Sequence, residues 1–189
     1  MIEQIRSSYF PTNLSEDVVV TAVSQQQFYA VTNQLYRHIF TPMGDLGLYQ
    51  VPAPPDSWGR KLAGQIHAEY FVFHNAAGEP VGFSLGKVVN EQTFFMEWSG
   101  ILPDYRRRGL YSHFLDALIP YLKALGLERI TSNHMGNNRP VLIAKLKAGF
   151  IITGTTLDER HGMLVWLARF LEPERERGFE RAFSLGNFA

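Results

Sequence analysis

Residues 98–115 read Trp-Ser-Gly-Ile-Leu-Pro-Asp-Tyr-Arg-Arg-Arg-Gly-Leu-Tyr-Ser-His-Phe-Leu, and their pattern decides the fold of this chain. An apolar strand ends at Pro103, three arginines and Gly109 follow, and an apolar helix begins after them. Unpaired N–H groups at a helix start bind anions, and guanidinium groups suit phosphate. Gly109 also lets a ligand approach the backbone closely. The stretch predicts a diphosphate cradle, and a solvated basic run before a helix is the alternative.

The segments on either side predict a sheet covered by helices. Expected in chain order are a strand at 17–23, helices at 25–39 and 58–66, strands at 68–74, 80–89 and 93–102, a helix from 109, a strand at 129–133, a helix at 140–148, strands at 150–156 and 162–167, and a helical tail at 172–181. Pro120 lies inside the long helix and should kink or split it. This order predicts an α/β (α+β) fold.

Composition narrows the classes of function. The length of 189 residues, with 46% hydrophobic and 19% charged, predicts one soluble domain over residues 1–189. With no cysteine there is no disulfide or thiolate site, and the six histidines lack metal-ligand spacing. Eighteen basic and eighteen acidic residues cancel, which argues against a nucleic-acid binder. A secretory signal and a membrane span are not evident, so we expect a cytoplasmic protein.

Two motifs together resemble a known family. Residues 101–111 are similar to the signature of the GCN5-related N-acetyltransferase (GNAT) superfamily, in which a strand ending in Val-x-Pro leads into Arg/Gln-x-x-Gly-x-Gly/Ala. Arg106 and Gly109 match its first two positions, whereas Tyr111 stands where the family usually has Gly or Ala. Residues 138–150, Asn-Arg-Pro-Val-Leu-Ile-Ala-Lys-Leu-Lys-Ala-Gly-Phe, resemble the later motif, in which Asn precedes a short helix ending in Gly-Phe. The motifs and the elements between them span residues 97–167.

The resemblance implies a fold and a cosubstrate. The fold would be a mixed, largely antiparallel sheet of six to seven strands, flanked by helices and splayed where acetyl-CoA binds. Backbone groups near Ile101 and Leu102 would hold the pantetheine arm. The loop and helix start that would hold the diphosphate comprise Arg106, Arg107, Arg108, Gly109, Leu110, Tyr111 and Ser112. Asn138 would contact the cofactor, and it is equally suited to cap the helix that follows.

The implied reaction is direct attack of an amine on acetyl-CoA, as in an N-acetyltransferase for a small-molecule or protein amine. An amine of pKa ~10.4 is on the order of 0.04% neutral at pH 7, so a base or a water relay is needed. Glu97 is one candidate, because it has the strand parity of Ser99 and Ile101. His134 is the other, with a pKa suited to proton transfer. A paired strand carboxylate and a loop histidine are the structural alternatives.

The proton for the leaving thiolate is the second problem. Many family members place a tyrosine about one turn before Gly-Phe as the acid, but Lys145 stands there in this chain. Lys145 could stabilise a thiolate, although a solvated helix lysine is the simpler interpretation. Tyr111 is a nearby alternative for the acid.

The acceptor side is predicted from an aromatic, partly acidic segment. Its residues are Tyr36, Phe40, Tyr49 and Trp58, with Asp45 and Asp56. Such a wall suits an amine on an apolar body, but the aromatics could equally belong to the core or to a dimer surface. The substitution at Lys145 keeps open a catalytically silent acyl-CoA-binding sensor or scaffold domain. The acceptor, the acyl chain length and the oligomeric state, including a homodimer, stay undetermined by the sequence.

Overall fold

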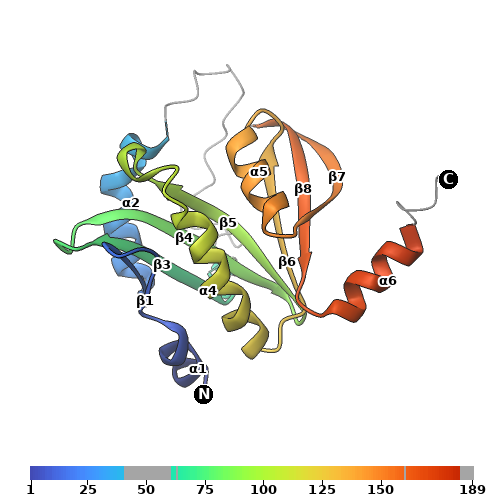
Figure 1. The fold of residues 1–189 in the computed structure, drawn as a ribbon, viewed down its shortest axis with the longest axis horizontal. Helices are drawn as coiled ribbons and strands as arrows, with labels where there is room; N and C mark the ends of the chain where they lie inside the picture. The colour runs from blue at the N-terminus through green and yellow to red at the C-terminus, as the bar shows by residue number, and fades with distance from the viewer. Residues whose placement is uncertain (41–60, 63, 160, 184–189) are drawn as a thin grey trace.

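The computed structural model describes residues 1–40, 61–62, 64–159 and 161–183. Its strands form one eight-stranded sheet in the order β1-β2-β3-β4-β5-β6-β8-β7 (Figure 1). Neighbouring strands are antiparallel except for β5 and β6, which are parallel. The predicted mixed, largely antiparallel sheet is therefore confirmed, and its eight strands exceed the six to seven expected.

The bounds of the elements agree with most of the predicted ranges. The strands are β1 Thr12–Asn13, β2 Val18–Ala22, β3 Ala68–Asn75, β4 Pro80–Asn90, β5 Thr93–Ile101, β6 Arg129–Met135, β7 Ile151–Asp158 and β8 Gly162–Phe170. The helices are α1 Ile2–Tyr9, α2 Gln25–Ile39, the 3₁₀ turn η1 Pro103–Tyr105, α4 Leu110–Ala124, α5 Arg139–Lys147 and α6 Pro173–Phe183. The sequence signals missed α1 and β1.

Helix α2 begins and ends at the predicted residues because its start carries a strong local signal. The Ser24 hydroxyl accepts a hydrogen bond from the Gln27 N–H at 3.3 Å, and the Gln27 side chain accepts one from the Ser24 N–H at 2.9 Å. This reciprocal pair satisfies two backbone donors that a helix start leaves open. The buried face of α2 carries Phe28, Leu35 and Ile39, which pack against β3 and β4.

Helix α4 runs without a break through Pro120, so the prediction that it splits there is wrong. Proline removes the hydrogen bond to the carbonyl four residues earlier, which belongs to Asp116. Both Pro120 and Asp116 are exposed, so water can satisfy that carbonyl. The apolar face of α4 meanwhile stays buried through Phe114 and Leu118.

The two faces of the sheet carry separate apolar clusters. Phe71 and Phe73 of β3 join the cluster under α4, whereas Val72 between them joins the cluster under α2. This alternation follows from the two-residue repeat of a strand. Figure 1 shows α4 and α5 in front of the sheet and α2 behind it, so both faces of the central strands are covered.

Helix α1 is fixed to the body by a buried ion pair. The Arg6 guanidinium donates to both carboxylate oxygens of Glu69, at 2.9 and 3.0 Å, and Glu69 is buried. The His67 ring lies 2.7 Å from the same carboxylate. Sequence periodicity carries no signal for this anchor, because its partners lie 63 residues apart.

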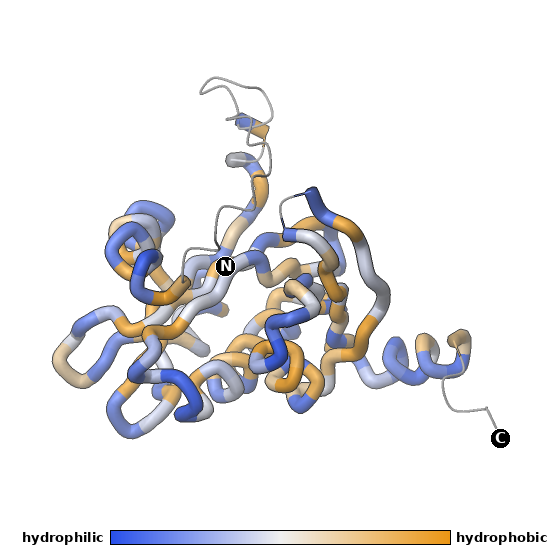
Figure 2. Tube along the Cα trace, turned by 90° about the horizontal axis from the view of Figure 1, so that it is seen from above, coloured by the Kyte–Doolittle hydropathy of each residue, from blue (hydrophilic) through white to orange (hydrophobic). Residues whose placement is uncertain are grey.

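Two further features complete the description of the fold. Helix α6 projects away from the rest of the chain (Figure 2). None of the helices within the described ranges is long and apolar enough to cross a membrane. Four residues of the predicted acceptor wall lie outside the described residues, namely Asp45, Tyr49, Asp56 and Trp58. Residues 58–60 and 63 of the short helix predicted over 58–66 lie outside them as well.

Candidate functional site

Strands β5 and β6 separate after a short paired stretch. Their described register has three pairs, from Thr93 with Arg129 to Phe95 with Thr131. Beyond Phe95, β5 continues to Ile101 while β6 continues to Met135, and the two strands diverge (Figure 1). Among the described strands, none pairs with the facing backbone edge of β5 there. An extended ligand can bind such an edge, and this is the splay that the family resemblance implies.

A bulge in β5 lies beside this opening. Leu85 of β4 pairs with Trp98 and Gly86 pairs with Met96, which leaves Glu97 as an extra residue. A bulge bends its strand and changes which face the following side chains occupy. Met96 packs in the cluster under α4, whereas Trp98 packs against the cluster under α2. The bulge thus sets the orientation of every side chain that follows on β5.

The end of β5 presents one backbone amide to the opening. The N–H of Leu102 donates to the Val81 carbonyl at 2.9 Å, so it faces β4. Because backbone groups alternate along a strand, the groups of Ile101 face the opposite edge, toward β6. The Ile101 carbonyl accepts from Arg106 Nε at 2.9 Å. The Ile101 N–H is thus placed to bind a ligand, whereas the Leu102 N–H is already engaged.

The start of α4 supplies further backbone donors. Gly109 has φ +77° and precedes the helix without a side-chain cap. The first helical bond runs from the His113 N–H to the Gly109 carbonyl at 3.0 Å, so the N–H groups of Leu110, Tyr111 and Ser112 precede it. Such groups, aligned with the helix dipole, form an anion site. The predicted helix start after Gly109 is present, and its binding of a diphosphate stays a prediction.

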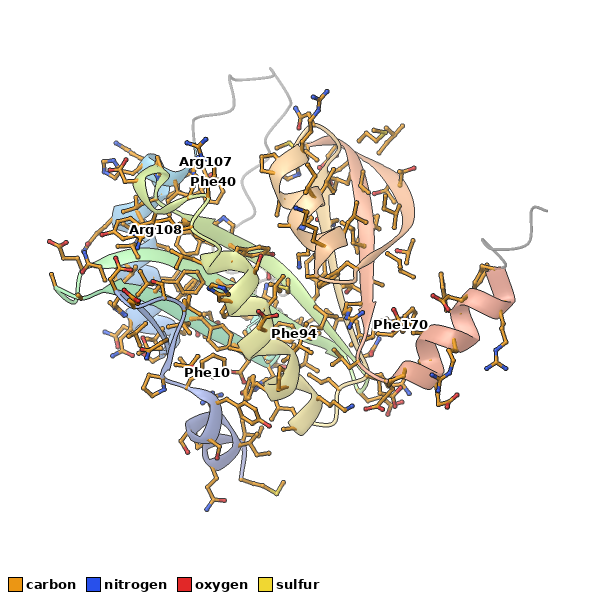
Figure 3. All side chains as sticks on the ribbon, viewed as in Figure 1. Phe10, Phe40, Phe94, Arg107, Arg108 and Phe170 are labelled. Atoms are coloured by element: carbon orange, nitrogen blue, oxygen red, sulfur yellow. The ribbon has the colours of Figure 1, made fainter. Side chains whose placement is uncertain are left out.

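The three arginines of the loop have different environments. Arg106 donates to the Ile39 carbonyl at 2.6 Å and therefore ties the loop to the end of α2. Arg108 pairs with both carboxylate oxygens of Asp17, at 2.5 and 2.7 Å, and the guanidinium lowers the pKa of that carboxyl. Arg107 is exposed and forms no hydrogen bond or ion pair with the residues that the structure describes (Figure 3). Of the three side chains, Arg107 alone has no partner among the described residues and is placed to meet a phosphate.

Asn138 lies at the start of α5. Its side chain makes no capping hydrogen bond within the described residues, so the capping role considered from the sequence is not observed. The side chain is exposed, and the backbone N–H donates to the Met135 carbonyl at 2.9 Å. The Asn138 amide is therefore available to a ligand.

Glu97 lies on a different face from the one its strand parity predicts. Its carboxylate pairs with Lys87 Nζ at 2.6 Å and is partly exposed. Ser99 hydrogen-bonds to Tyr111 of α4, and Ile101 packs in the cluster under α4. The bulge explains the difference, because the extra residue breaks the two-residue alternation between Glu97 and Ser99. Glu97 therefore lies on the α2 side of β5, opposite to the face predicted from strand parity.

The pKa of His134 lies well below neutrality. Desolvation and, to a lesser extent, the charge of Lys145 lower its pKa to about 4. Its Nε2 is buried without a hydrogen-bond partner in the described structure. At pH 7 the ring is neutral and binds a proton weakly, which contradicts the prediction that its pKa suits proton transfer.

Lys145 lies in a different environment from the solvated helix position that the sequence suggested. Its side chain is fully buried rather than solvated. Its Nζ lies 2.9 Å from Met96 Sδ and 4.0 Å from the centre of the Phe150 ring. Burial lowers the pKa of the amine to about 7. The sequence contains one indication that Lys145 faces inward. Lys145 follows Leu142 by three residues on α5 and so lies on the same face of the helix, and Leu142 is partly buried.

Tyr111 is oriented toward β5. Burial raises the pKa of its phenol, and a hydrogen bond with Ser99 opposes that shift. The centre of its ring is 5.7 Å from Lys145 Nζ. The structure therefore brings Tyr111, Ser99 and Lys145 together beside the opening, while Glu97 lies on the other face of the sheet.

The α2 side of β5 carries aromatic side chains and a pocket. Phe40 stacks on Trp98 with ring centres 6.0 Å apart, and Tyr36 lies 5.6 Å from the same indole. Nearby, a pocket of about 380 Å³ is lined by Leu35, His38, Leu102, Pro103 and Asp104. The lining of this pocket combines apolar surface with the Asp104 carboxylate.

Comparison with known proteins agrees with this geometry. A family model described as "Acetyltransferase (GNAT) family" matches residues 33–150, which is more than half of the chain. The chain belongs to the GNAT acetyltransferase family. Acetyl-CoA is the cosubstrate of this family. A search of curated protein sequences gave no significant match.

Solved structures with the same fold include two well-covered examples. The spermidine/spermine N-acetyltransferase SpeG of Vibrio cholerae, solved with manganese ions, is 13% identical with a TM-score of 0.60, over 87% of this chain and 99% of that one. The ribosomal-protein-S18-alanine N-acetyltransferase of Escherichia coli is 13% identical with a TM-score of 0.61, over 82% of this chain and 94% of that one. In this GNAT protein, the described residues hold no cluster of three or more metal-ligating side chains.

Proposed function

We propose that this GNAT protein transfers the acetyl group of acetyl-CoA to an amine of a small molecule or a protein. The observation that carries the proposal is the divergence of β5 and β6 beside the helix start at Gly109. An unpaired strand edge suits the amides of a pantetheine arm, and a helix N-terminus suits a diphosphate. The two lie at opposite ends of one loop, residues 102–109.

Each part of the cosubstrate has a matching group in the chain. The Ile101 N–H would bind the pantetheine arm, and the first-turn N–H groups of α4 would bind the diphosphate. Arg107 would add charge at the phosphates, because its two neighbours are engaged elsewhere. The Asn138 side chain is exposed and makes no capping hydrogen bond within the described residues, so it would bind the pantetheine or the nucleotide from the other side of the opening.

The transfer itself requires removal of a proton from the acceptor amine. With the pKa of His134 lowered to about 4, Glu97 is the better candidate for the base, acting directly or through a water molecule. The Glu97 carboxylate lies 2.6 Å from the Lys87 ammonium, which fixes its position on the α2 side of β5. The amine nitrogen then attacks the carbonyl carbon of the thioester, and the sulfur leaves with the bonding electron pair.

The acceptor would lie on the α2 side of β5. There, Tyr36, Phe40 and Trp98 form an aromatic surface next to the pocket that contains Asp104. Aromatic faces and a carboxylate attract a protonated amine on an apolar body. The similar structures include a spermidine/spermine acetyltransferase and a ribosomal-protein-alanine acetyltransferase, so both polyamines and peptides belong in the screen.

The test combines binding with turnover. The melting temperature is followed during titration with acetyl-CoA, with ATP as a control. Saturation at about 100 times Kd adds ~2.7 kcal/mol of stability. Release of the coenzyme A thiol is then measured with a panel of polyamines, aromatic amines and peptides. Turnover with one class establishes the acceptor, binding without turnover favours the silent acyl-CoA-binding domain, and no binding refutes the proposal.

A further inference from the structure

A buried amine lies where β5 and β6 separate. Met96 is the first residue of β5 beyond the last β5–β6 pair, and its Sδ contacts Lys145 Nζ at 2.9 Å. Tyr111, in the first turn of α4, approaches the same nitrogen through its ring at 5.7 Å. The amine is therefore next to both features that support the acetyl-CoA site, namely the open strand edge and the helix start.

The surroundings of this amine contain aromatic rings and a thioether but no negative charge. Across the described ranges, no carboxylate pairs with Lys145, which is fully buried. Two polar atoms on β6, Ser132 Oγ and His134 Nε2, are also buried and have no hydrogen-bond partner in the part of the chain that the structure describes. A buried cation without a counter-ion destabilises a fold. A ligand that brings negative charge to this point would remove the penalty.

We propose that Lys145 binds the sulfur of free coenzyme A as a thiolate, in a buried ammonium–thiolate ion pair. The proposal rests on the acetyl-CoA function above and assigns a specific ligand atom to the unpaired amine. A thioester sulfur is neutral and gains nothing from the ammonium, whereas a thiolate does. Lys145 would therefore favour the leaving group over the bound cosubstrate, which is the kind of differential binding that accelerates a reaction.

The charges balance through the transfer step. A bond forms between the acceptor nitrogen and the carbonyl carbon, the carbon–sulfur bond breaks, and its electron pair goes to sulfur. The Lys145 ammonium compensates that charge and keeps its proton while the pair lasts. The proton lost by the acceptor amine leaves through the base on the α2 side. Coenzyme A then takes a proton from solvent as it departs as the thiol.

The protonation state of Lys145 depends on the groups that face it. His134 on β6 is neutral at pH 7, and Tyr111 on α4 is an uncharged phenol there. Arg169 on β8 is cationic, but its guanidinium donates to the Gly149 carbonyl at 3.1 Å and pairs with Glu176 at 3.4 Å. Glu97 on β5 faces the other side of the sheet, with Lys87. A bound thiolate would be the one anion in contact with the amine, so it would hold Lys145 protonated above neutrality.

The test measures the acidity of the bound thiol. Coenzyme A is bound to the full-length protein and its thiolate is followed by ultraviolet absorbance as pH is raised. We expect the pKa of the thiol to fall by at least about one unit on binding to the wild type, and to stay at its free value in Lys145→Met. With a free thiol pKa of ~8.5, a one-unit shift makes coenzyme A bind about threefold more tightly than desulfo-coenzyme A at pH 8, and isothermal titration should show this in the wild type only.

A matched control lies two residues along the same helix. Lys147 is exposed, so Lys147→Met removes the same charge from α5 and should leave both measurements as in the wild type. Binding of coenzyme A to the wild type with an unshifted thiol pKa would overturn the thiolate assignment while leaving the proposed function intact. Failure of both coenzyme A and acetyl-CoA to bind would overturn the two proposals together.

Discussion

Helices α4 and α5 both border the opening between β5 and β6, but they contribute different chemistry. The start of α4 offers backbone N–H groups in an exposed loop shaped by Gly109. Helix α5 offers a single buried side chain, Lys145, enclosed by residues from other elements. A backbone site leaves a signature in the local sequence, because only certain residues permit its shape. A buried side chain acquires its properties from neighbours that are distant along the chain.

The largest expected effect concerns the cost of burying Lys145. Its pKa is about 7 in the folded chain against a reference of 10.5, so the unfolded chain binds more protons between these values. Stability of the wild type should therefore rise as pH increases from 7 to 10.5, and the charge should cost on the order of 4 kcal/mol at pH 6. Lys145→Met removes this penalty and should raise the melting temperature at pH 6. Thermal unfolding from pH 6 to 10 measures both curves.

The control for this prediction is again Lys147→Met, because that side chain is exposed on the same helix. Its stability curve should run parallel to that of the wild type. If both methionine variants shift the curve equally, or if Lys145→Met destabilises the protein at pH 6, the amine is not buried as described.

Burial of His134 should have a smaller effect on stability than burial of Lys145, and at lower pH. Its pKa is about 4 in the fold against a reference of 6.5, so the unfolded chain binds more protons between these values. Stability should fall as pH drops from 6.5 to 4, by about 2–3 kcal/mol, and be unaffected by this group above pH 7. His134→Leu should remove that part of the acid sensitivity, as measured by urea unfolding at pH 4.5 and 7.5. His38→Leu, at an exposed position on α2, should retain it.

The contrast between the two helices also explains which features the sequence could predict. The bounds of α2 followed from Ser24 and Gln27, and the phosphate loop followed from Gly109, since both signals are local. The face of Glu97 could not be predicted, because the bulge depends on how β5 pairs with β4. The spacing of Lys145 from Leu142 indicated the inward face of α5, but its full burial depends on distant contacts such as the one with Met96, 49 residues away.

Gly109 and Gly78 allow backbone strain to be separated from ligand binding. Both have positive φ, +77° and +78°, so a side chain at either position strains the backbone. A Cβ at Gly109 would come 3.3 Å from the His113 ring, beside the proposed diphosphate site, whereas one at Gly78 meets nothing within 4 Å. Gly109→Val should raise the Kd for acetyl-CoA at least about tenfold, equivalent to 1.4 kcal/mol. Gly78→Val should lower the melting temperature similarly but leave Kd unchanged. Equal affinities in the two variants would show that the α4 start does not bind the cosubstrate.

Arg107 and Arg108 provide the smallest and most selective test of the backbone site. Both are exposed arginines of one loop, but Arg108 is engaged with Asp17 while Arg107 is free among the described residues. Arg107→Ala should therefore weaken acetyl-CoA binding by roughly threefold at low salt, and Arg108→Ala should change it little. Because exposed charge pairs are screened, the difference between the variants should shrink as salt is raised. Titration calorimetry at two salt concentrations measures the difference in acetyl-CoA affinity between the two variants. An equal loss in both variants would mean that Arg108 leaves Asp17 for the phosphates, and the loop would then bind through its side chains as much as through its backbone.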